Sequence, residues 1–227
     1  MESVAIIIPA YNEEDSIEHV IKDLPSNSFH YLIVVDNNST DNTSAIATKN
    51  NATVLFEKHP GYGSACLKGI EYLKSLQTPP SIVVFLDADY SDHSNEITQL
   101  TNKINEGYDF VIGNRVKYLR ERGSMLPQQI IGNKLAVFLI KLFHKFRYYD
   151  LGPFRAIKYN ALLTLNMEDK TYGWTVEMQI KALKHKLKIA EIPVHYRKRI
   201  GKSKISGTIK GTIMAGIKII KTIFKYR

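Results

Sequence analysis

Short apolar runs alternate with longer amphipathic stretches over the first half of the chain. The apolar runs are rich in Val, Ile, Leu and Phe and are bounded by Pro, Gly and Asp or Asn, so they predict strands. The stretches between them place apolar residues at helical spacing and predict helices. The predicted strands are residues 4–8, 32–35, 53–55, 82–86 and 110–112, and the predicted helices are 14–24, 43–50, 64–76 and 95–105.

This alternation predicts an α/β fold with a mostly parallel, Rossmann-like sheet and helices on both faces. In such sheets, ligands bind at the carboxyl ends of the strands. Polar segments follow four of the five predicted strands: PAYNEE after the first, DNNSTDNT after the second, DADYSD after the fourth and GNR after the fifth. We therefore expect a binding site at that edge of the sheet.

The pattern changes after residue 116. A basic loop, KYLRERG, leads to a predicted helix at 133–146; a second helix is predicted within YGWTVEMQIKA and a strand at 189–196. Residues 206–226 predict a helix with isoleucines on one face and lysines on a neighbouring arc. Such a basic amphipathic helix either lies on an anionic membrane surface or packs against its own domain or a second copy. We expect a catalytic domain at 1–205 and this helix at 206–227.

Composition and charge narrow the classes of protein. The hydrophobic fraction of 44% suits a globular core, and the lone Cys66 excludes an internal disulfide and favours a reducing compartment. The chain opens without a basic leader, and no apolar stretch reaches the roughly 20 residues of a transmembrane helix, so we expect a cytosolic location. Residues 181–227 carry 14 Lys and Arg against one acid, Glu191. This end predicts an anionic partner, although no nucleic-acid-binding motif accompanies it.

Three carboxylates crowd the end of the fourth predicted strand, at Asp87, Asp89 and Asp92. Like charges at this spacing repel unless a cation lies between them, and hard divalent ions such as Mg²⁺ or Mn²⁺ prefer oxygen ligands. We interpret Asp87 and Asp89 as ligands of such an ion, and Asp92 as the cap of the next helix. The alternative is a solvated, Asp-rich turn.

Two other segments could contact a nucleotide. Asp36, which leaves the second strand, could accept hydrogen bonds from a base or ribose, as the acidic residue of dinucleotide folds does. The glycine-spaced segment 59–69 opens a helix and could bring backbone N–H groups near phosphate. That segment matches neither the P-loop pattern nor the dinucleotide fingerprint, which disfavours those enzyme classes.

The chain carries six motifs in this order: PAYNEE, VVDNNSTDNT, GYGSACLKG, DAD, IGNR and DLGPFRA. On these motifs the chain resembles glycosyltransferase family 2 over residues 4–208. The resemblance is nearest to the branch of polyprenyl-phosphate sugar transferases that includes dolichol-phosphate mannose synthase. It implies a GT-A fold, a UDP- or GDP-linked hexose as donor, Mg²⁺ or Mn²⁺ as cofactor and inversion at the anomeric carbon. It also implies a polyprenyl phosphate acceptor at the cytosolic face of a membrane, where a membrane protein or a second copy is a possible further partner.

The resemblance also implies the residues of the site. The implied metal ligands are Asp87, Asp89 and Ser91. A mobile basic loop within residues 195–208 would cover the diphosphate and offset the charge of the leaving group. The implied contacts to the nucleotide sugar are Pro9, Tyr11, Asn12, Glu13, Asp36, Gly63, Asp87, Ala88, Arg199 and Lys204.

The chain departs from the family pattern at two places. Relatives often have DDGS where this chain has Asp36-Asn37-Asn38-Ser39, so an amide replaces one carboxylate. Many relatives also carry an arginine shortly before the pair Gly132-Asn133, where this chain has Gln-Ile-Ile. Arg120 or Arg122 could supply the missing ligand of the acceptor phosphate.

Arginines suit phosphate because a guanidinium can donate two parallel hydrogen bonds to its oxygens. We predict that Arg115, Arg120 and Arg122, together with Ser203, bind the acceptor phosphate. Arg115 and Arg155 join Asp87 and Asp89 as predicted catalytic residues. Arg155 could equally form a structural ion pair with Asp150.

Trp174 and Glu177 each have two interpretations, and the role of Glu177 depends on the type of acceptor. The tryptophan either stacks on the sugar or nucleotide or packs in the core. Glu177 could act as a general base if the acceptor were a hydroxyl of a glycan, a lipid or a small metabolite, which is the alternative function. A phosphate acceptor needs no base, because its second pKa of about 6 leaves its oxygen largely ionised.

Overall fold

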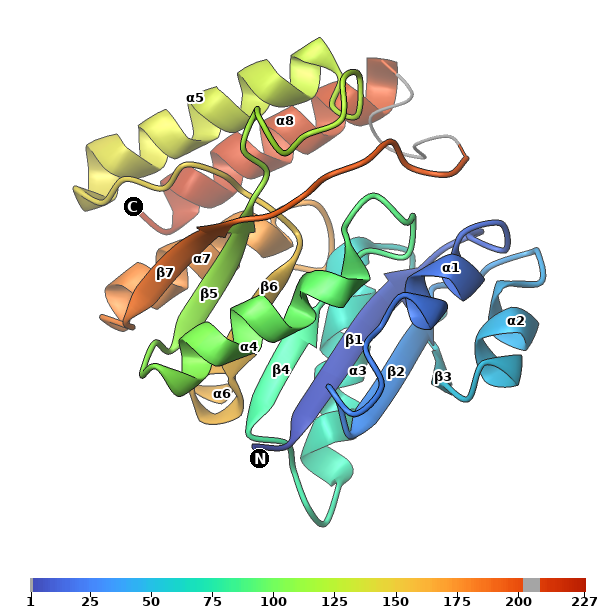
Figure 1. Ribbon diagram of the computed structural model, residues 1–227. Helices are drawn as coiled ribbons and strands as arrows, with labels where there is room; N and C mark the ends of the chain where they lie inside the picture. Colours follow the sequence, from blue (N-terminus) through green and yellow to red (C-terminus); the bar gives the residue numbers. More distant parts are fainter. Residues whose placement is uncertain (1, 202–208) are drawn as a thin grey trace.

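The computed structural model describes residues 2–201 and 209–227, and its centre is a single twisted sheet (Figure 1). Among the described residues, the sheet has the strand order β3-β2-β1-β4-β6-β5-β7. Every strand runs parallel to its neighbours except β6, which is antiparallel to β4 and β5. The predicted mostly parallel sheet is confirmed. The strands are β1 (Val4–Ala10), β2 (Tyr31–Asp36), β3 (Thr53–Phe56), β4 (Ile82–Phe85), β5 (Phe110–Asn114), β6 (Arg155–Lys158) and β7 (Ile189–Pro193).

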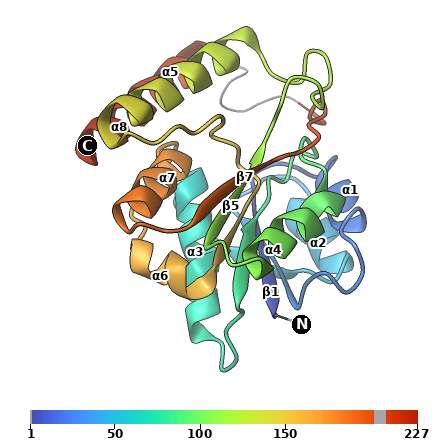
Figure 2. The same ribbon diagram turned by 60° about the vertical axis from the view of Figure 1, so that its left-hand side comes forward.

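Helices cover both faces of the sheet, because alternate strand residues enter two separate cores. Ile6 and Ile8 of β1 pack with α1, α2 and α4, whereas Ala5 and Ile7 pack on the other side with α3 and α7. Figure 2 shows these helices about the sheet. The helices are α1 (Ile17–Lys22), α2 (Thr43–Lys49), α3 (Tyr62–Ser75), α4 (Ile97–Asn105), α5 (Pro127–His144), α6 (Tyr159–Leu165), α7 (Trp174–Lys184) and α8 (Ile209–Lys225), with a 3-10 turn η1 (Ser94–Glu96).

Two elements were not predicted, and two predicted helices begin earlier, α3 by two residues and α5 by six. Strand β6 has only four residues and the short helix α6 follows it directly, so neither shows a clear period in the sequence. Helix α5 starts at Pro127 rather than 133, because a proline fits the first turn of a helix. The antiparallel β6 lies between β4 and β5 and therefore separates two groups of parallel strands.

The predicted C-terminal helix is confirmed as α8, which packs beside α5 and α7 (Figure 1). Its Ile223 is fully buried, and the ring of Phe224 lies 5.3 Å from that of Phe143 in α5. The predicted domain boundary after residue 205 lies outside the described residues. Within the described chain, no helix combines the length and apolar character needed to traverse a bilayer.

Candidate active site

A cleft of about 360 Å³ opens at the carboxyl ends of β1, β2 and β4, where the polar segments were expected to meet. This volume lies within the range of sites for small molecules. The cleft is lined by six of the residues predicted to contact the donor, Pro9, Tyr11, Glu13, Asp87, Ala88 and Arg199, together with Asp89. Two more, Asn12 and Gly63, are not lining residues, but each is adjacent in sequence to one that is.

The guanidinium of Arg199 bridges two carboxylates inside the cleft. Its Nη1 lies 3.0 Å from Asp89 Oδ2 and its Nη2 lies 3.0 Å from Glu13 Oε1. The other oxygen of Asp89 accepts hydrogen bonds from the backbone N–H and the hydroxyl of Ser91. Ser91 therefore orients Asp89, so that one oxygen is held and the other faces the guanidinium of Arg199.

Asp87 is the second carboxylate of the cleft. Its Oδ1 is buried and has no hydrogen-bond partner among the described residues. Burial, with the nearby charge of Asp89, raises the pKa of Asp87 to about 7. This unpartnered oxygen and the carboxylate of Asp89, which also lines the cleft, form a donor set that fits a hard divalent ion. In residues 2–201 and 209–227, no three His, Cys, Asp or Glu side chains gather at metal-ligand spacing, so diphosphate oxygens and water would complete the shell.

The interpretation of Asp92 as a helix cap was wrong. The N-cap position of η1 is His93, and the backbone of Asp92 pairs instead with Tyr196. The side chain of Asp92 is buried, and neither carboxylate oxygen has a hydrogen-bond partner among the described residues. Burial, together with the charges of Asp87 and Asp89, raises the pKa of Asp92 well above its usual value.

The hydrogen bonds of Asn37 explain why this chain has an amide where relatives often have a carboxylate. Its Nδ2 donates to the carbonyl oxygens of Glu57 (3.0 Å) and His59 (2.7 Å), while its Oδ1 accepts from the N–H of Gly61 (2.7 Å). A carboxylate has no proton to donate to two carbonyls. Asn37 thus anchors segment 57–61, of which Pro60 and Gly61 line the cleft, and it also lines the cleft itself.

Asp36 does not line the cleft, contrary to expectation. Its Oδ1 accepts a hydrogen bond of 2.9 Å from the backbone N–H of Ser39, and its Oδ2 accepts one from the hydroxyl of Ser44. The carboxylate therefore stabilises the turn that follows β2, and the side chain is buried.

The two arginines predicted to be catalytic, Arg115 and Arg155, have largely buried side chains that bind other parts of the protein. Arg115 Nε and Nη2 each lie 2.8 Å from an oxygen of Asp150, and its guanidinium covers the ring of Tyr196. Arg155 is fully buried and donates to the carbonyl oxygens of Thr175 and Gly152. Asp150, the expected ion-pair partner of Arg155, therefore pairs with Arg115 instead. Neither arginine lines the cleft.

The remaining candidates for the acceptor phosphate lie on or beyond the loop after β5. Arg120 is half-buried with its Nη1 3.2 Å from the sulfur of Met125, and Arg122 is exposed. Ser203 and Lys204 lie outside the described residues.

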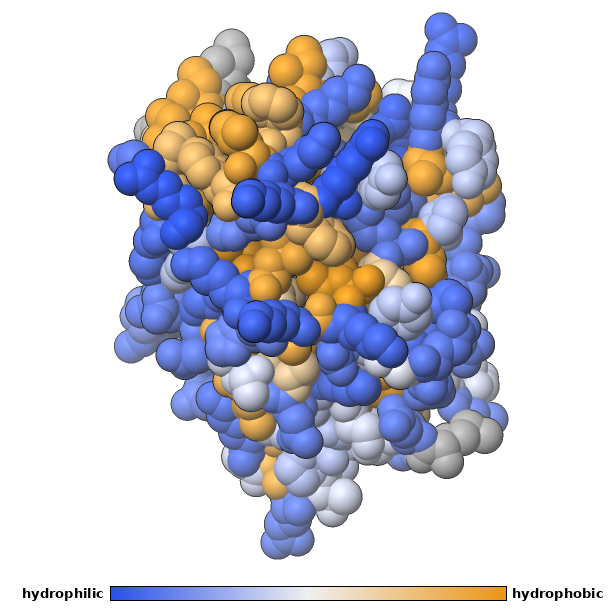
Figure 3. All heavy atoms as spheres, turned by 90° about the vertical axis from the view of Figure 1, so that its left-hand side faces the viewer, coloured by the Kyte–Doolittle hydropathy of each residue, from blue (hydrophilic) through white to orange (hydrophobic). Residues whose placement is uncertain are grey.

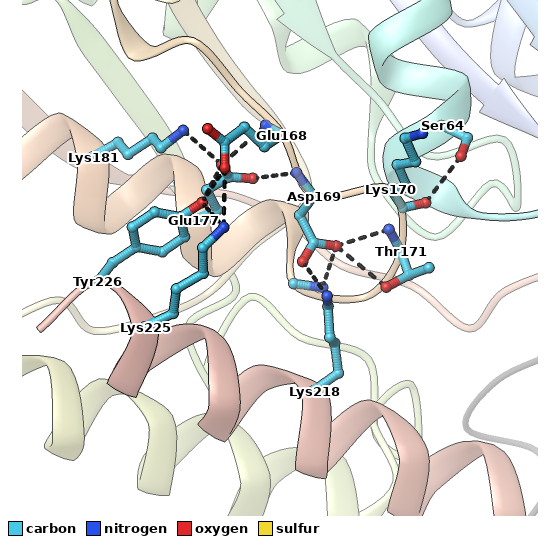
Figure 4. Close-up of polar contacts among 11 residues, drawn as sticks. Ser64, Glu168, Asp169, Lys170, Thr171, Glu177, Lys181, Lys218, Lys225 and Tyr226 are labelled. Carbon is cyan, nitrogen blue, oxygen red and sulfur yellow. Dashed lines mark hydrogen bonds and ion pairs between the residues drawn. The ribbon is translucent and has the colours of Figure 1, made fainter.

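Trp174 and Glu177 do not reach the cleft either. Trp174 is buried and packs edge-on against Phe85, with ring centroids 5.8 Å apart. The carboxylate of Glu177 is fully buried and accepts hydrogen bonds from the backbone N–H groups of Glu168 (3.0 Å) and Asp169 (2.7 Å) (Figure 4). Glu177 thus secures the chain that leads into α7.

Sequence reasoning missed two aromatic residues that line the cleft, Tyr62 at the start of α3 and Tyr172 just before α7. Each stands beside a glycine, Gly61 or Gly173, and an aromatic residue next to a glycine at a helix start was the only available signal. More than 100 residues separate them, so only the folded chain brings them together.

Comparison with known proteins gives a consistent assignment. Residues 5–164 match the family model described as Glycosyl transferase family 2. The chain is 31% identical over 223 residues to an uncharacterized glycosyltransferase of Mycobacterium tuberculosis, covering 98% of each chain. It is 28% identical over 231 residues to a dolichyl-phosphate hexose transferase of Haloferax volcanii, covering 100% of this chain and 96% of that one.

Among solved structures, the fold is similar to glucosyl-3-phosphoglycerate synthase of Mycobacterium tuberculosis, crystallised with Mn²⁺, UDP and glucosyl-3-phosphoglycerate. The TM-score is 0.78 at 21% identity, and the match covers 99% of this chain and 80% of that chain. The predicted GT-A fold is thereby confirmed.

Proposed function

This chain belongs to glycosyl transferase family 2, and from that premise we propose that it transfers a hexose from a UDP- or GDP-linked sugar to a polyprenyl phosphate. The cleft supports the donor half of this proposal, because it gathers carboxylates, a guanidinium and aromatic side chains at the carboxyl ends of parallel strands. The name of the relative from Haloferax volcanii, a dolichyl-phosphate hexose transferase, supports the acceptor half.

The observation that carries the choice of acceptor is the position of Glu177. Its carboxylate is fully buried outside the cleft, where it accepts hydrogen bonds from backbone N–H groups. It is therefore not placed to take a proton from an acceptor hydroxyl. A phosphate monoester needs no such base, since its oxygen is largely ionised at neutral pH. An acceptor that arrives already ionised therefore fits this site better than an alcohol.

We propose that Asp87 and Asp89 hold Mg²⁺ or Mn²⁺, with Ser91 orienting Asp89. Such an ion, when bound, neutralises charge on the departing nucleoside diphosphate. Arg199 pairs with Asp89 and Glu13, and among the described residues that line the cleft its guanidinium is the cationic group placed to bind the diphosphate oxygens.

The reaction is a single displacement at the anomeric carbon. A phosphate oxygen of the acceptor forms the new bond to that carbon while the bond to the diphosphate oxygen breaks, and the electron pair leaves with the nucleoside diphosphate. Attack opposite the leaving group inverts the configuration. No proton has to move at the acceptor, and Arg120 or Arg122 would orient its phosphate.

The test is to incubate the purified chain with Mn²⁺, a panel of UDP- and GDP-hexoses, and three acceptors: a short polyprenyl phosphate, the matching polyprenol and 3-phosphoglycerate. We expect sugar transfer to the polyprenyl phosphate alone. Transfer to the polyprenol or to the hydroxyl of 3-phosphoglycerate would instead support the hydroxyl-acceptor alternative.

Metal affinity should depend on pH. Because burial and the charge of Asp89 raise the pKa of Asp87 to about 7, a cation must displace a proton from Asp87 at lower pH. We expect Mn²⁺ affinity, measured by calorimetry in the presence of UDP or GDP, to weaken by up to about tenfold per pH unit as the pH falls below 7. An affinity that is flat between pH 6 and pH 8 would contradict a direct role for Asp87.

A lipid-linked acceptor requires access to a membrane, and we propose that the outer faces of α5 and α8 provide it. Apolar side chains gather in the upper part of the molecule, where these helices lie (Figure 3). Phe138 and Leu142 of α5 are 59% and 61% exposed, and Ile213 and Ile217 of α8 are 55% and 45% exposed. Exposed lysines of α5, at 134 and 141, would add attraction to anionic lipid of about 1 kcal/mol each.

Replacing Phe138 and Leu142 together by aspartate should weaken binding to vesicles that contain phosphatidylglycerol by about tenfold or more, because two apolar side chains no longer enter the bilayer. Flotation of protein with vesicles measures this binding. Phe56→Asp is the matched control, since Phe56 is 58% exposed on the edge strand β3, away from α5 and α8. An unchanged flotation of the double variant would contradict this surface.

A further inference from the structure

The turn at residues 168–173, between α6 and α7, joins the donor cleft to the C-terminal helix. On one side it carries Tyr172 into the lining of the cleft. On the same side, the carbonyl oxygen of Lys170 accepts a 2.9 Å hydrogen bond from the N–H of Ser64, in the first turn of α3. On its other side, its acidic side chains contact α8 (Figure 4).

The contact with α3 is tight because it depends on glycines. A Cβ at Gly63 would lie 2.0 Å from the carbonyl oxygen of Asp169, and one at Gly61 would lie 2.1 Å from that of Lys170. Both contacts are with backbone atoms, which cannot rotate away as a side chain can. A displacement of this turn would therefore also displace the start of α3, which contributes Gly61 and Tyr62 to the cleft.

Asp169 holds the turn together and ties it to α8. Its Oδ1 accepts hydrogen bonds from the backbone N–H groups of Thr171 (2.8 Å) and Gly173 (3.2 Å), on either side of Tyr172. Its Oδ2 lies 2.7 Å from Nζ of Lys218 in α8. The side chain of Asp169 is only 7% exposed, so Lys218 supplies the countercharge of a largely buried carboxylate.

Further contacts join the same two elements. The hydroxyl oxygen of Tyr226, just after α8, lies 3.0 Å from both Glu177 Oε1 and Glu168 Oε2 and shares its proton with them. A Cβ at Gly173 would lie 2.5 Å from the hydroxyl oxygen of Thr222, so the turn packs directly on α8.

We infer that Lys218 of α8 is a positioning residue for the nucleotide sugar: through Asp169 it fixes the turn that places Tyr172 and the start of α3 in the donor cleft. This inference rests on the proposed function, because it takes the cleft to be the site of a nucleoside diphosphate. The C-terminal helix then contributes to donor binding as well as to the outer surface of the molecule.

The test measures nucleotide binding without turnover. Trp174 is the single tryptophan of the chain and directly follows the turn, so its fluorescence reports the binding of UDP or GDP in the presence of Mn²⁺. We expect Lys218→Ala to raise the Kd of whichever nucleotide the wild type binds by about fivefold or more, as is common for coupled sites. At saturating donor, kcat should change little, because the reacting groups are untouched.

The matched control is Lys221→Ala, which removes the same charge from an exposed position of α8 that has no ion pair in the described chain. It should bind nucleotide as the wild type does, and Lys218→Arg should restore most of the affinity. The Lys218 side chain is 41% exposed, so we expect its alanine variant to remain folded, which thermal unfolding checks.

Asp169→Asn gives a second, independent variant. It keeps an oxygen for the N–H groups of Thr171 and Gly173 but removes the charge that faces Lys218. If Lys218 and Asp169 act as a unit, the effects of the two substitutions should not add. The variant that carries both Lys218→Ala and Asp169→Asn should then have a nucleotide Kd no higher than that of the more impaired single variant.

Two failures are distinguishable. A folded Lys218→Ala variant with the Kd of the wild type would overturn the positioning role and leave the proposed function intact. A wild type that binds neither UDP nor GDP would overturn the proposed function itself.

Discussion

Replacing Asp89 by alanine should reduce sugar transfer by about a hundred- to a thousandfold, the loss that follows when a group that stabilises developing charge is removed. Asp89 Oδ2 faces the guanidinium of Arg199 in the cleft, and Ser91 holds the other oxygen in place. Initial rates of transfer to a polyprenyl phosphate measure the loss. Calorimetry with Mn²⁺ and UDP or GDP should show weaker metal-assisted binding in the same variant.

The controls separate charge from shape. Asp89→Asn keeps the size of the side chain and removes its charge, so it should be nearly as impaired as the alanine variant. Asp15→Ala removes an exposed acid two residues from Glu13 and should transfer sugar at the rate of the wild type. If Asp89→Ala kept more than about a tenth of the activity, the assignment of this carboxylate to the metal and diphosphate would be wrong.

Replacing Arg115 by alanine should lower the free energy of unfolding by about 3–5 kcal/mol, since it leaves a buried carboxylate without its countercharge. The side chains of Arg115 and Asp150 are 12% and 4% exposed and share two hydrogen bonds of 2.8 Å. Burial alone would raise the pKa of Asp150, but the charge and hydrogen bonds of Arg115 outweigh it and lower that pKa. Unfolding in urea measures the change.

Because the folded-state pKa of Asp150 is lowered, its stabilising contribution is present above the unfolded-state pKa and is lost as the pH falls through the folded-state value. The stability difference between wild type and Arg115→Ala should therefore shrink in acid. Lys117→Ala, an exposed substitution in the same loop, should leave unfolding unchanged. An Arg115→Ala variant as stable as the wild type, yet inactive, would instead favour the catalytic role predicted from the sequence.

The effects of these substitutions differ in kind. Asp89 lies in the cleft, so its loss should appear in the rate of transfer. Arg115 does not line the cleft and lies over the ring of Tyr196, so its loss should appear first in stability. Measuring both quantities for both variants separates residues that act on the substrate from those that hold the sheet together.

The edge of the sheet where the site lies could be predicted from the sequence. Apolar runs followed by polar segments marked strands whose carboxyl ends must meet, because strand–helix–strand connections make neighbouring strands parallel. For that reason Asp87 and Asp89 were expected at that edge, and the family resemblance added Glu13; all three line the cleft. The basic amphipathic helix at the C-terminus was equally visible, since its period does not depend on the rest of the chain.

Only the tertiary structure decided which partner each charged side chain has. A sequence shows that Arg115, Arg155 and Glu177 are near polar motifs, but not which way each points. Strand β6 inserts antiparallel between β4 and β5, and it was not predicted. Arg155 begins that strand, within the core, while Asp150 just before it pairs with Arg115.

The same distinction applies to Glu177, Tyr172 and Lys218. Their roles depend on α7 and α8 packing against the turn at 168–173, a set of contacts between segments that are distant in the chain. Local patterns determine where strands and helices form, because each needs only its own period and its own caps. The pairing of buried charges depends on how those elements pack, because each charge must find a partner wherever the fold brings one within reach.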